Sequence, residues 1–297
     1  MNVKKAIRFM KEGLFFYRLK TRKLYEKYGM LGDDLTIKEA SKFLNKKYGK
    51  FCNEYEKCEK SQNSKPKIIW WCWLQGEENA PDLCKGALES LRRHYPDFKI
   101  NIITSKNMLE YITLPDYIID KYNKGLITHT HFSDILRAEL LVEHGGTWID
   151  SSVFCTKRSN ILEKDEFFVY KSFLKSDYSI VASSWLISAE KNNNIIRMTR
   201  DLLLEYWKKH NILIHYYLFH LFFTMATKKY SEEWNLLNNY PNANPHILQF
   251  EMFDEYDAKR MNEIKYFADF HKLTQKSNIT NYSKNSYYAK ISNGETL

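Results

Sequence analysis

The sequence has few cysteines, and their arrangement argues against two classes of protein. Only five occur in 297 residues, an odd number, and none forms a Cys-x-x-Cys pair. Disulfide frameworks pair their cysteines, and structural zinc sites use closely spaced ones. We therefore expect free thiols in a reducing cytoplasm, with neither a disulfide framework nor a zinc site.

Long apolar runs are also missing. A helix that crosses a bilayer needs about 20 consecutive apolar residues. The nearest candidate, residues 212–226, is interrupted by His215 and His220 and fits a buried helix better. Basic residues are spread through the only mildly apolar N-terminus, so it does not read as a signal peptide. We find no internal repeat and no low-complexity tract, and we expect a cytoplasmic protein.

Positive charge is concentrated at one end of the chain. The net charge is +9, but residues 1–67 hold 18 Lys and Arg against 8 Asp and Glu, and the remaining residues hold 27 against 28. Apolar residues recur at helical spacing within residues 1–30, with Lys and Arg between them. Such a helix can lie peripherally on the anionic inner face of the cell membrane, or pack as an ordinary surface helix. Nucleic acid is not an expected partner, because the aromatic residues here belong to the buried face.

Short apolar runs alternate with helical patterns in the rest of the chain. The composition, 44% hydrophobic and 15% aromatic, is that of a folded protein rather than a disordered one. Strands are expected at 67–73, 99–103, 147–149, 153–154, 167–170 and 180–187, and helices at 35–60, 81–94, 134–144, 192–210 and 212–230. Continuous apolar strands that alternate with helices predict an α/β fold, with three layers and a mostly parallel sheet.

Breaks in these patterns predict the domain organisation. The polar segment 61–66 is the best linker candidate. We predict a basic N-terminal helical region at 1–65 and an α/β catalytic domain at 66–280, with a helical insertion around 192–240. Residues 281–297 would form a polar, loosely held C-terminal tail.

The centre of the chain carries the strongest functional signal. Ser133 or Asp134 can cap a helix, and Gly145-Gly146 can end it with positive φ. Asp134 and Arg137 lie three residues apart, so both can point at the same spot. The following buried strand ends at Asp150, a carboxylate that needs a charged or hydrogen-bonding partner. Open α/β sheets bind ligands beyond the carboxyl ends of their strands, so this unit predicts half of a phosphate–sugar site.

These residues resemble a known family. Residues 133–137, Ser-Asp-Ile-Leu-Arg, followed by Gly-Gly and by an apolar residue and Asp, resemble the DXD-containing GT-A glycosyltransferases. With segments 70–81 (Trp-Trp-Cys-Trp-Leu-Gln-Gly-Glu-Glu-Asn-Ala-Pro) and 271–276 (His-Lys-Leu-Thr-Gln-Lys), the chain is similar to the bacterial capsular polysaccharide synthesis proteins over roughly 66–276. One departure matters: Asp150-Ser151-Ser152 stands where the wider superfamily has Asp-x-Asp.

The resemblance implies a GT-A (Rossmann-like) domain, to which N- and C-terminal helices are added, and a role for each matching residue. The implied catalytic residues are Asp134, Arg137 and Asp150. The implied donor-binding residues are Trp73, Gln75, Ser133, Asp134, Arg137, Asp150, Ser152 and Lys276, with Trp73 stacked on the uracil. The implied metal ligands are Asp150 and His271, for a manganese or magnesium ion held weakly because Ser152 is not a carboxylate. Ordinary structural roles remain open: an Asp134–Arg137 ion pair, core positions for Trp73 and His271, and a surface position for Lys276.

The implied activity is that of a retaining glycosyltransferase. It would move a hexose from a UDP-linked donor to a lipid-linked or polysaccharide acceptor of the capsule or cell surface. Two alternatives are a non-catalytic glycan- or nucleotide-binding relative and an interaction protein that works through its basic N-terminal arm.

Overall fold

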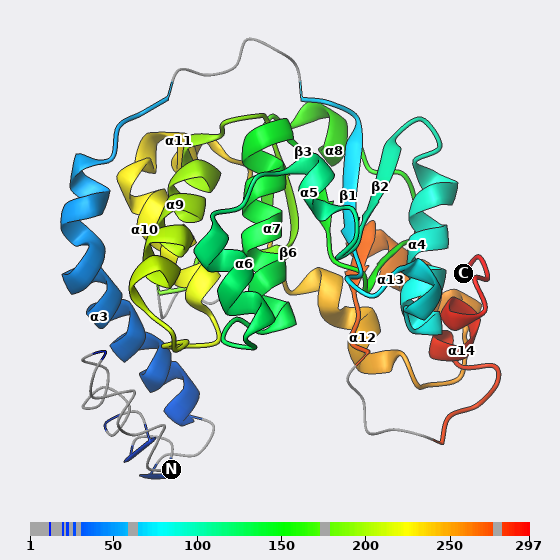
Figure 1. Ribbon diagram of the computed structural model, residues 1–297. Coiled ribbons are helices and arrows are strands. Elements are labelled where there is room, and N and C mark those ends of the chain that lie inside the picture. The colour runs from blue at the N-terminus through cyan, green and yellow to red at the C-terminus, as the bar shows by residue number, and fades with distance from the viewer. Residues whose placement is uncertain are drawn as a thin grey trace.

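The fold is built around a five-stranded sheet with the order β2-β1-β3-β6-β5. The computed structural model describes residues 31–58, 65–172, 179–275 and 281–297, with a few isolated positions before residue 31 (Figure 1). The strands of this sheet are β1 (Ile68–Cys72), β2 (Lys99–Ile103), β3 (Gly146–Ile149), β5 (Phe168–Lys171) and β6 (Ala182–Ala189). β1 pairs in parallel with β2 and β3, whereas β6 pairs antiparallel with β3 and β5. β6 therefore runs against the other four, and the prediction of a mixed α/β fold with a mostly parallel sheet is confirmed.

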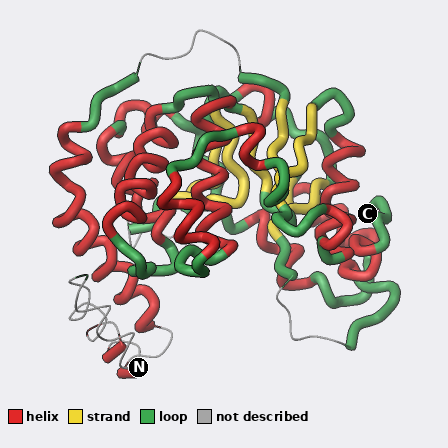
Figure 2. Tube along the Cα trace, in the orientation of Figure 1, coloured by secondary structure: helices red, strands yellow, loops and turns green. Residues whose placement is uncertain are grey.

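Helices cover both faces of the sheet (Figure 2). One layer contains α3 (Leu31–Glu54), α7 (His129–His144), α9 (Asn194–Lys209) and α10 (Leu218–Lys229), and the other contains α4 (Asp82–His94). Alternate side chains of β1 reach opposite layers: Trp70 packs with the first group, whereas Ile69 and Trp71 pack with α4. A strand buried on both faces reads as a continuous apolar run, which is why the sequence revealed it.

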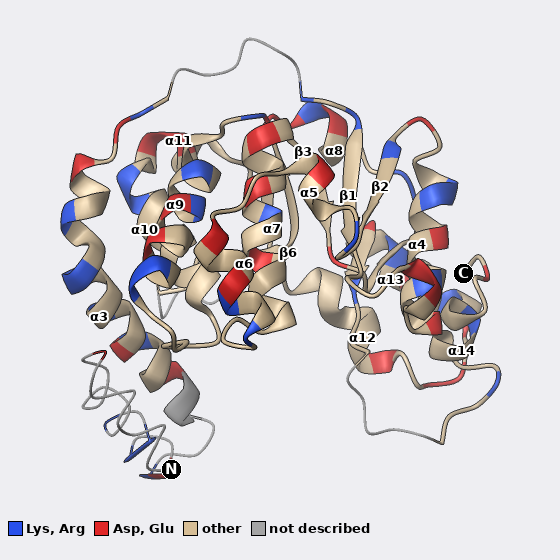
Figure 3. Ribbon diagram, in the orientation of Figure 1, with Lys and Arg blue, Asp and Glu red and all other residues tan. Residues whose placement is uncertain are grey.

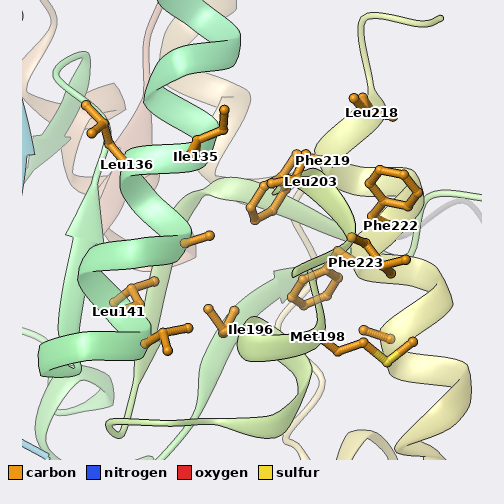
Figure 4. Close-up of a cluster of buried hydrophobic side chains, with 14 of the residues drawn as sticks. Ile135, Leu136, Leu141, Ile196, Met198, Leu203, Leu218, Phe219, Phe222 and Phe223 are labelled. Atoms are coloured by element: carbon orange, nitrogen blue, oxygen red, sulfur yellow. The ribbon is translucent and has the colours of Figure 1, made fainter. Parts of the chain in front are cut away.

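The first layer holds the largest apolar cluster. It contains Leu136 and Leu141 of α7, Ile196 of α9 and Phe222 of α10, and all four are essentially inaccessible to solvent (Figure 4). The cluster packs α7 against its neighbours, and α7 carries three of the predicted site residues, Ser133, Asp134 and Arg137. The predicted helical insertion consists of α9, α10 and α11 (Ser231–Leu236).

Two glycines join α7 to β3 in conformations that other residues rarely adopt. Gly145 has φ 69° and Gly146 has φ 93°. A Cβ at Gly146 would stand 2.8 Å from the carbonyl oxygen of Ile68, and Trp70 donates from Nε1 to the carbonyl oxygen of Gly145 at 2.8 Å. The glycine pair thus lets β3 lie against β1 directly after the helix.

A second, smaller sheet pairs β4 (Val153–Cys155) antiparallel with β7 (Phe270–Lys272). The other helices are α5 (Met108–Tyr111), α6 (Asp116–Asn123), α8 (Ile161–Lys164), α12 (Ile247–Glu251), α13 (Ala258–Phe267) and α14 (Tyr287–Ser292), with 3-10 turns η1 (Glu77–Asn79) and η2 (Asn244–His246). We had expected the C-terminal residues to be loosely held, but the structure shows them packed against the rest of the chain. Tyr287 and Ile291 of α14 are buried in a cluster with Leu83 of α4, so apolar contacts fix this end.

The structure says little about the basic N-terminal region, because most of residues 1–30 lie outside the described part of the chain. Along the described helices, basic and acidic residues are interspersed (Figure 3). Among the residues that the structure describes, there is no helix with the length and apolar character needed to cross a membrane.

Candidate active site

Asp150 lies at the carboxyl end of β3, in a tight turn that leads to β4. Its backbone N–H donates to the carbonyl oxygen of Trp185 at 2.8 Å, and its carbonyl oxygen accepts from the N–H of Val153 at 3.0 Å. Trp148, two residues earlier on the same strand face, donates from Nε1 to Asp150 Oδ1 at 2.8 Å. The turn and the indole together hold the carboxylate in one position at the edge of the sheet.

Arg137 of α7 bridges the two predicted carboxylates. Its Nη1 donates to Asp134 Oδ1 at 2.8 Å and its Nη2 to Asp150 Oδ1 at 2.9 Å. The guanidinium lies over the rings of Trp148 and Phe219, with 5.0 and 5.3 Å to their centroids. Only 4% of the Arg137 side chain is exposed, against 10% for Asp134 and 25% for Asp150. The structure therefore brings together the three residues that the sequence singled out, in a largely buried chain of charges.

Lys272 of β7 completes this group, and sequence reasoning missed it. Its Nζ donates to Asp150 Oδ2 at 3.0 Å and to Ser152 Oγ at 2.8 Å. Ser152 in turn donates from Oγ to the carbonyl oxygen of Leu273 at 2.9 Å, and the Leu273 N–H donates to the Ser152 carbonyl oxygen at 2.9 Å. Ser152, predicted to bind the donor, thus anchors β7 and the lysine to the Asp150 turn. The signal available in the sequence was the position of Lys272 next to a residue of the family resemblance.

Burial and these charges together determine the protonation of the groups at the site. Burial alone would raise the pKa of Asp150, but the positive charges of Lys272 and Arg137 outweigh burial and hold that pKa below its usual range. Burial raises the pKa of the Cys72 thiol to about 12. Burial also lowers the pKa of the His220 imidazole to about 4. At neutral pH the site therefore holds an ionised Asp150 and a neutral, unreactive thiol.

Trp73 and Gln75 follow β1 at the same edge of the sheet. Because Trp70 pairs in parallel register with Trp148, the end of β1 is level with Asp150. The Trp73 side chain is half-buried against the α4 layer, and Gln75 is exposed. Both residues thus lie at the predicted edge of the sheet, but neither is joined to the Arg137 bridge by a hydrogen bond.

The start of α7 differs from the prediction. The helix begins at His129, so neither Ser133 nor Asp134 is its cap, and Thr128 precedes it. Ser133 instead donates from Oγ to the carbonyl oxygen of Thr130 at 2.8 Å, one helical turn back. The Ser133 hydroxyl is thereby satisfied within the helix rather than at its start.

Two further side chains flank Asp134, and neither was assigned a role from the sequence. His131 Nδ1 lies 3.6 Å from Asp134 Oδ2, and its ring centroid lies 5.7 Å from that of Tyr216. Tyr216 is 55% exposed, so its ring is accessible to solvent next to Asp134. An exposed aromatic ring next to a carboxylate can pack on the apolar face of a sugar while the carboxylate accepts its hydroxyls.

His271, predicted as a metal ligand, and the side chain that reaches Asp150 lie on opposite faces of β7. His271 is fully buried, and its Nε2 lies 3.2 Å from Thr156 Oγ1. Successive side chains of a strand point to opposite faces, and Lys272 is the one that reaches Asp150. Among the described residues, no three His, Cys, Asp or Glu side chains are grouped so that they could hold a metal ion. Lys276, the remaining predicted donor contact, lies outside the described residues.

The groups around Asp150 also fit a divalent cation poorly. An ionised carboxylate has about four lone-pair positions, and Arg137, Trp148 and Lys272 already donate to three of them. A divalent ion on Oδ2 would stand next to the Lys272 ammonium. At about 4 Å and an effective dielectric constant of about 20, the two would repel by about 8 kcal/mol. Asp150 can hold such an ion only if Lys272 moves away.

Comparison with known proteins identifies the family. Among solved structures, the chain is similar to the PaToxG glycosyltransferase, with 18% identity, a TM-score of 0.41, and coverage of 78% of this chain and 84% of that one. It is also similar to the apo-form glycosyltransferase GlyE of Streptococcus pneumoniae, with 12% identity, a TM-score of 0.38, and coverage of 77% and 60%. No curated protein matches the sequence significantly. The family described as capsular polysaccharide synthesis protein matches residues 30–291, almost the whole chain, and this protein therefore belongs to that family.

Proposed function

We propose that this protein is a retaining glycosyltransferase of GT-A type that moves a hexose from a UDP-linked donor to a capsular or surface polysaccharide. The observation that carries the proposal is the Asp134–Arg137–Asp150 chain at the carboxyl edge of β1 and β3. Burying three charges is expensive, and apolar residues would stabilise the fold as well or better. A charge cluster kept at the ligand-binding edge of an α/β sheet is better explained by function.

The chemistry of these groups fits a sugar and its leaving diphosphate. Asp134 Oδ1 accepts from Arg137, whereas Oδ2 has His131 Nδ1 at 3.6 Å, beyond hydrogen-bond distance, and so can accept a hydroxyl of the donor or acceptor. The donors of Arg137 are fixed by two carboxylates and two aromatic rings, so they would not need to reorganise when negative charge develops. Positioning and electrostatic stabilisation of the leaving nucleotide would then supply most of the rate.

The groups at the site favour a front-face mechanism. A double displacement needs a free nucleophile on the far side of the sugar. Asp150 is engaged by three donors, the Cys72 thiol is protonated at neutral pH, and the available oxygen of Asp134 is the one assigned to a hydroxyl of the donor or acceptor. A front-face reaction keeps the anomeric configuration without a protein nucleophile, because the acceptor attacks from the side on which the nucleotide leaves.

Donor hydrolysis tests the proposal. We expect the protein to release UDP slowly from one of a set of UDP-hexoses, measured by mass spectrometry, and faster once an acceptor is supplied. Asp134→Asn and Asp150→Asn should lower turnover by about 100-fold or more, the usual effect of removing a positioned charge. Asp97→Asn, which alters a surface ion pair with Arg158, is the matched control and should retain turnover. Near-normal turnover in both site variants would refute the assignment.

One observation keeps a second candidate open. Ser152 provides no second carboxylate, and Lys272 donates hydrogen bonds to both Ser152 and Asp150. A non-catalytic relative that binds a nucleotide or glycan would show saturable UDP binding with no release of UDP from any donor. The further possibilities, membrane attachment or partner binding through the basic N-terminal arm, stay predictions, since that region lies outside the described residues.

A further inference from the structure

The turn that follows β3 contains a fixed positive charge. Lys272 Nζ lies 3.0 Å from Asp150 Oδ2 and 2.8 Å from Ser152 Oγ, so one ammonium joins both polar ends of the Asp150-Ser151-Ser152 turn. The side chain is 21% exposed, so a ligand can still reach the ammonium from solvent. An ammonium has three N–H donors, and these two bonds leave one for a ligand.

The backbone holds this ammonium rigidly. Lys272 belongs to a strand, not to a loop, and Val153 of β4 is its partner in the pairing register. Two hydrogen bonds between Ser152 and Leu273 fix the residue directly after the lysine to the turn. A charge held in this way loses little entropy when it meets a ligand.

Charge balance shows what the lysine replaces. Two carboxylates and one divalent cation would sum to zero at this turn, and so do one carboxylate and one ammonium. Ser152, which takes the place of the second carboxylate, accepts a hydrogen bond from that ammonium. The Lys272 ammonium therefore balances the charge of Asp150 at this turn without a second carboxylate or a cation.

We propose that Lys272 binds the diphosphate of the nucleotide donor directly and that the site works without a divalent cation. This inference rests on the proposed function. The diphosphate would accept the remaining N–H of Lys272, while Asp150 and Ser152 keep the ammonium in place. A positive charge built into a strand would offset the negative charge of the leaving nucleotide, as a metal ion does in a metal-dependent site.

Calorimetry with UDP tests the inference on the full-length protein. We expect the dissociation constant of UDP to agree within about twofold between excess EDTA and added manganese. Lys272→Met should weaken UDP binding in EDTA by about tenfold or more, the usual effect of one charge-assisted hydrogen bond. It should leave uridine binding unchanged, because uridine has no phosphate. Manganese should restore part of the lost UDP affinity in this variant alone, since removal of the ammonium frees Asp150 Oδ2.

The controls separate a ligand contact from a structural role. Lys290 of α14 has the same 21% exposure and forms an ion pair with Glu295. The Lys290→Met variant should therefore bind UDP normally. Lys272→Arg keeps the charge and should keep binding in EDTA. Should Lys272→Met fail to fold, the EDTA and manganese comparison on the unaltered protein still decides.

Each contrary outcome has its own meaning. A tenfold or greater loss of UDP affinity in EDTA by the unaltered protein would overturn the inference, as would normal UDP binding by Lys272→Met. Either result leaves the proposed transferase intact, with a metal ion or Arg137 as the diphosphate contact. Absence of UDP binding, with and without manganese, would refute the proposed function and the inference together.

Discussion

Replacing Arg137 by methionine should destabilise this protein far more than the loss of any exposed ion pair. The guanidinium is 4% exposed and donates to two carboxylates. Methionine preserves most of the apolar stem but removes the guanidinium, and with it the charge, the two hydrogen bonds and the contacts over the rings of Trp148 and Phe219. Asp150 would keep Lys272 and Trp148, but among the described residues Asp134 would keep only His131, at 3.6 Å.

The magnitude follows from that unpaired carboxylate. Breaking a buried ion pair by removing one partner typically costs about 3 to 5 kcal/mol. We expect the lower end of this range, because Asp134 remains 10% exposed and water can reach it. The double variant Arg137→Met with Asp134→Asn should recover part of the loss, since the stranded negative charge is then gone.

Urea unfolding at neutral pH, followed by tryptophan fluorescence, measures this difference. The control is Arg158→Met, which breaks an exposed pair with Asp97 and should cost at most about 1 kcal/mol. The dependence of the unfolding free energy on urea should be the same in all variants, so that midpoints can be compared. If Arg137→Met unfolds within about 1 kcal/mol of the unaltered protein, the buried charge chain does not contribute as we describe.

Three further predictions concern pH and packing. Burial lowers the pKa of His271 to about 3, so the unfolded chain binds this proton first, and His271 should contribute about 1.4 kcal/mol per pH unit to the fall in stability below about pH 6.5; in urea unfolding the slope of His271→Gln should be smaller by this amount, and an equal slope would contradict it. Because the pKa of Asp150 is lowered in the folded state, its stabilisation is present above about pH 4 and lost below, so the melting-temperature difference from Asp150→Asn should shrink as the solution is acidified; a constant difference would count against the ion pairs. Gly86→Ala would place a Cβ 1.7 Å from the carbonyl oxygen of Ile291 and should cost about 1 to 3 kcal/mol in a melting experiment, whereas Gly49→Ala, with nothing within 4 Å, should be neutral or slightly stabilising; equal effects would show that α14 yields.

Local patterns in the sequence predicted much of this fold. The expected strand at 99–103 is β2, and the expected helix at 81–94 differs from α4 by one residue. Both depend on neighbouring residues: a continuous apolar run in one case, and an apolar helical face in the other. The Arg137 bridge was predictable for the same reason, because helix periodicity and a glycine turn fix the positions of Asp134 and Asp150 over a short span.

Pairing between distant segments was harder to predict. A strand was expected at 180–187, close to β6 (Ala182–Ala189), but its apolar sequence does not tell its direction. That direction depends on the connection from β5, part of which lies outside the described residues. The sequence pattern gave only the strand, and the antiparallel pairing with β3 came from the assembled sheet.

The register of β7 determines the charge of the whole site. His271 and Lys272 are adjacent and polar, and β7 is only three residues long, so no periodicity says which of them faces Asp150. The choice is made by pairing with β4, more than 110 residues earlier, where Phe154 is opposite His271. A shift of one residue would bring an imidazole to Asp150 and carry the ammonium away. The two substitutions should therefore have opposite signatures: His271→Gln alters the pH dependence of stability with UDP binding unchanged, whereas Lys272→Met weakens UDP binding and makes it respond to manganese. The reverse result would place His271, not Lys272, beside Asp150 in the working protein.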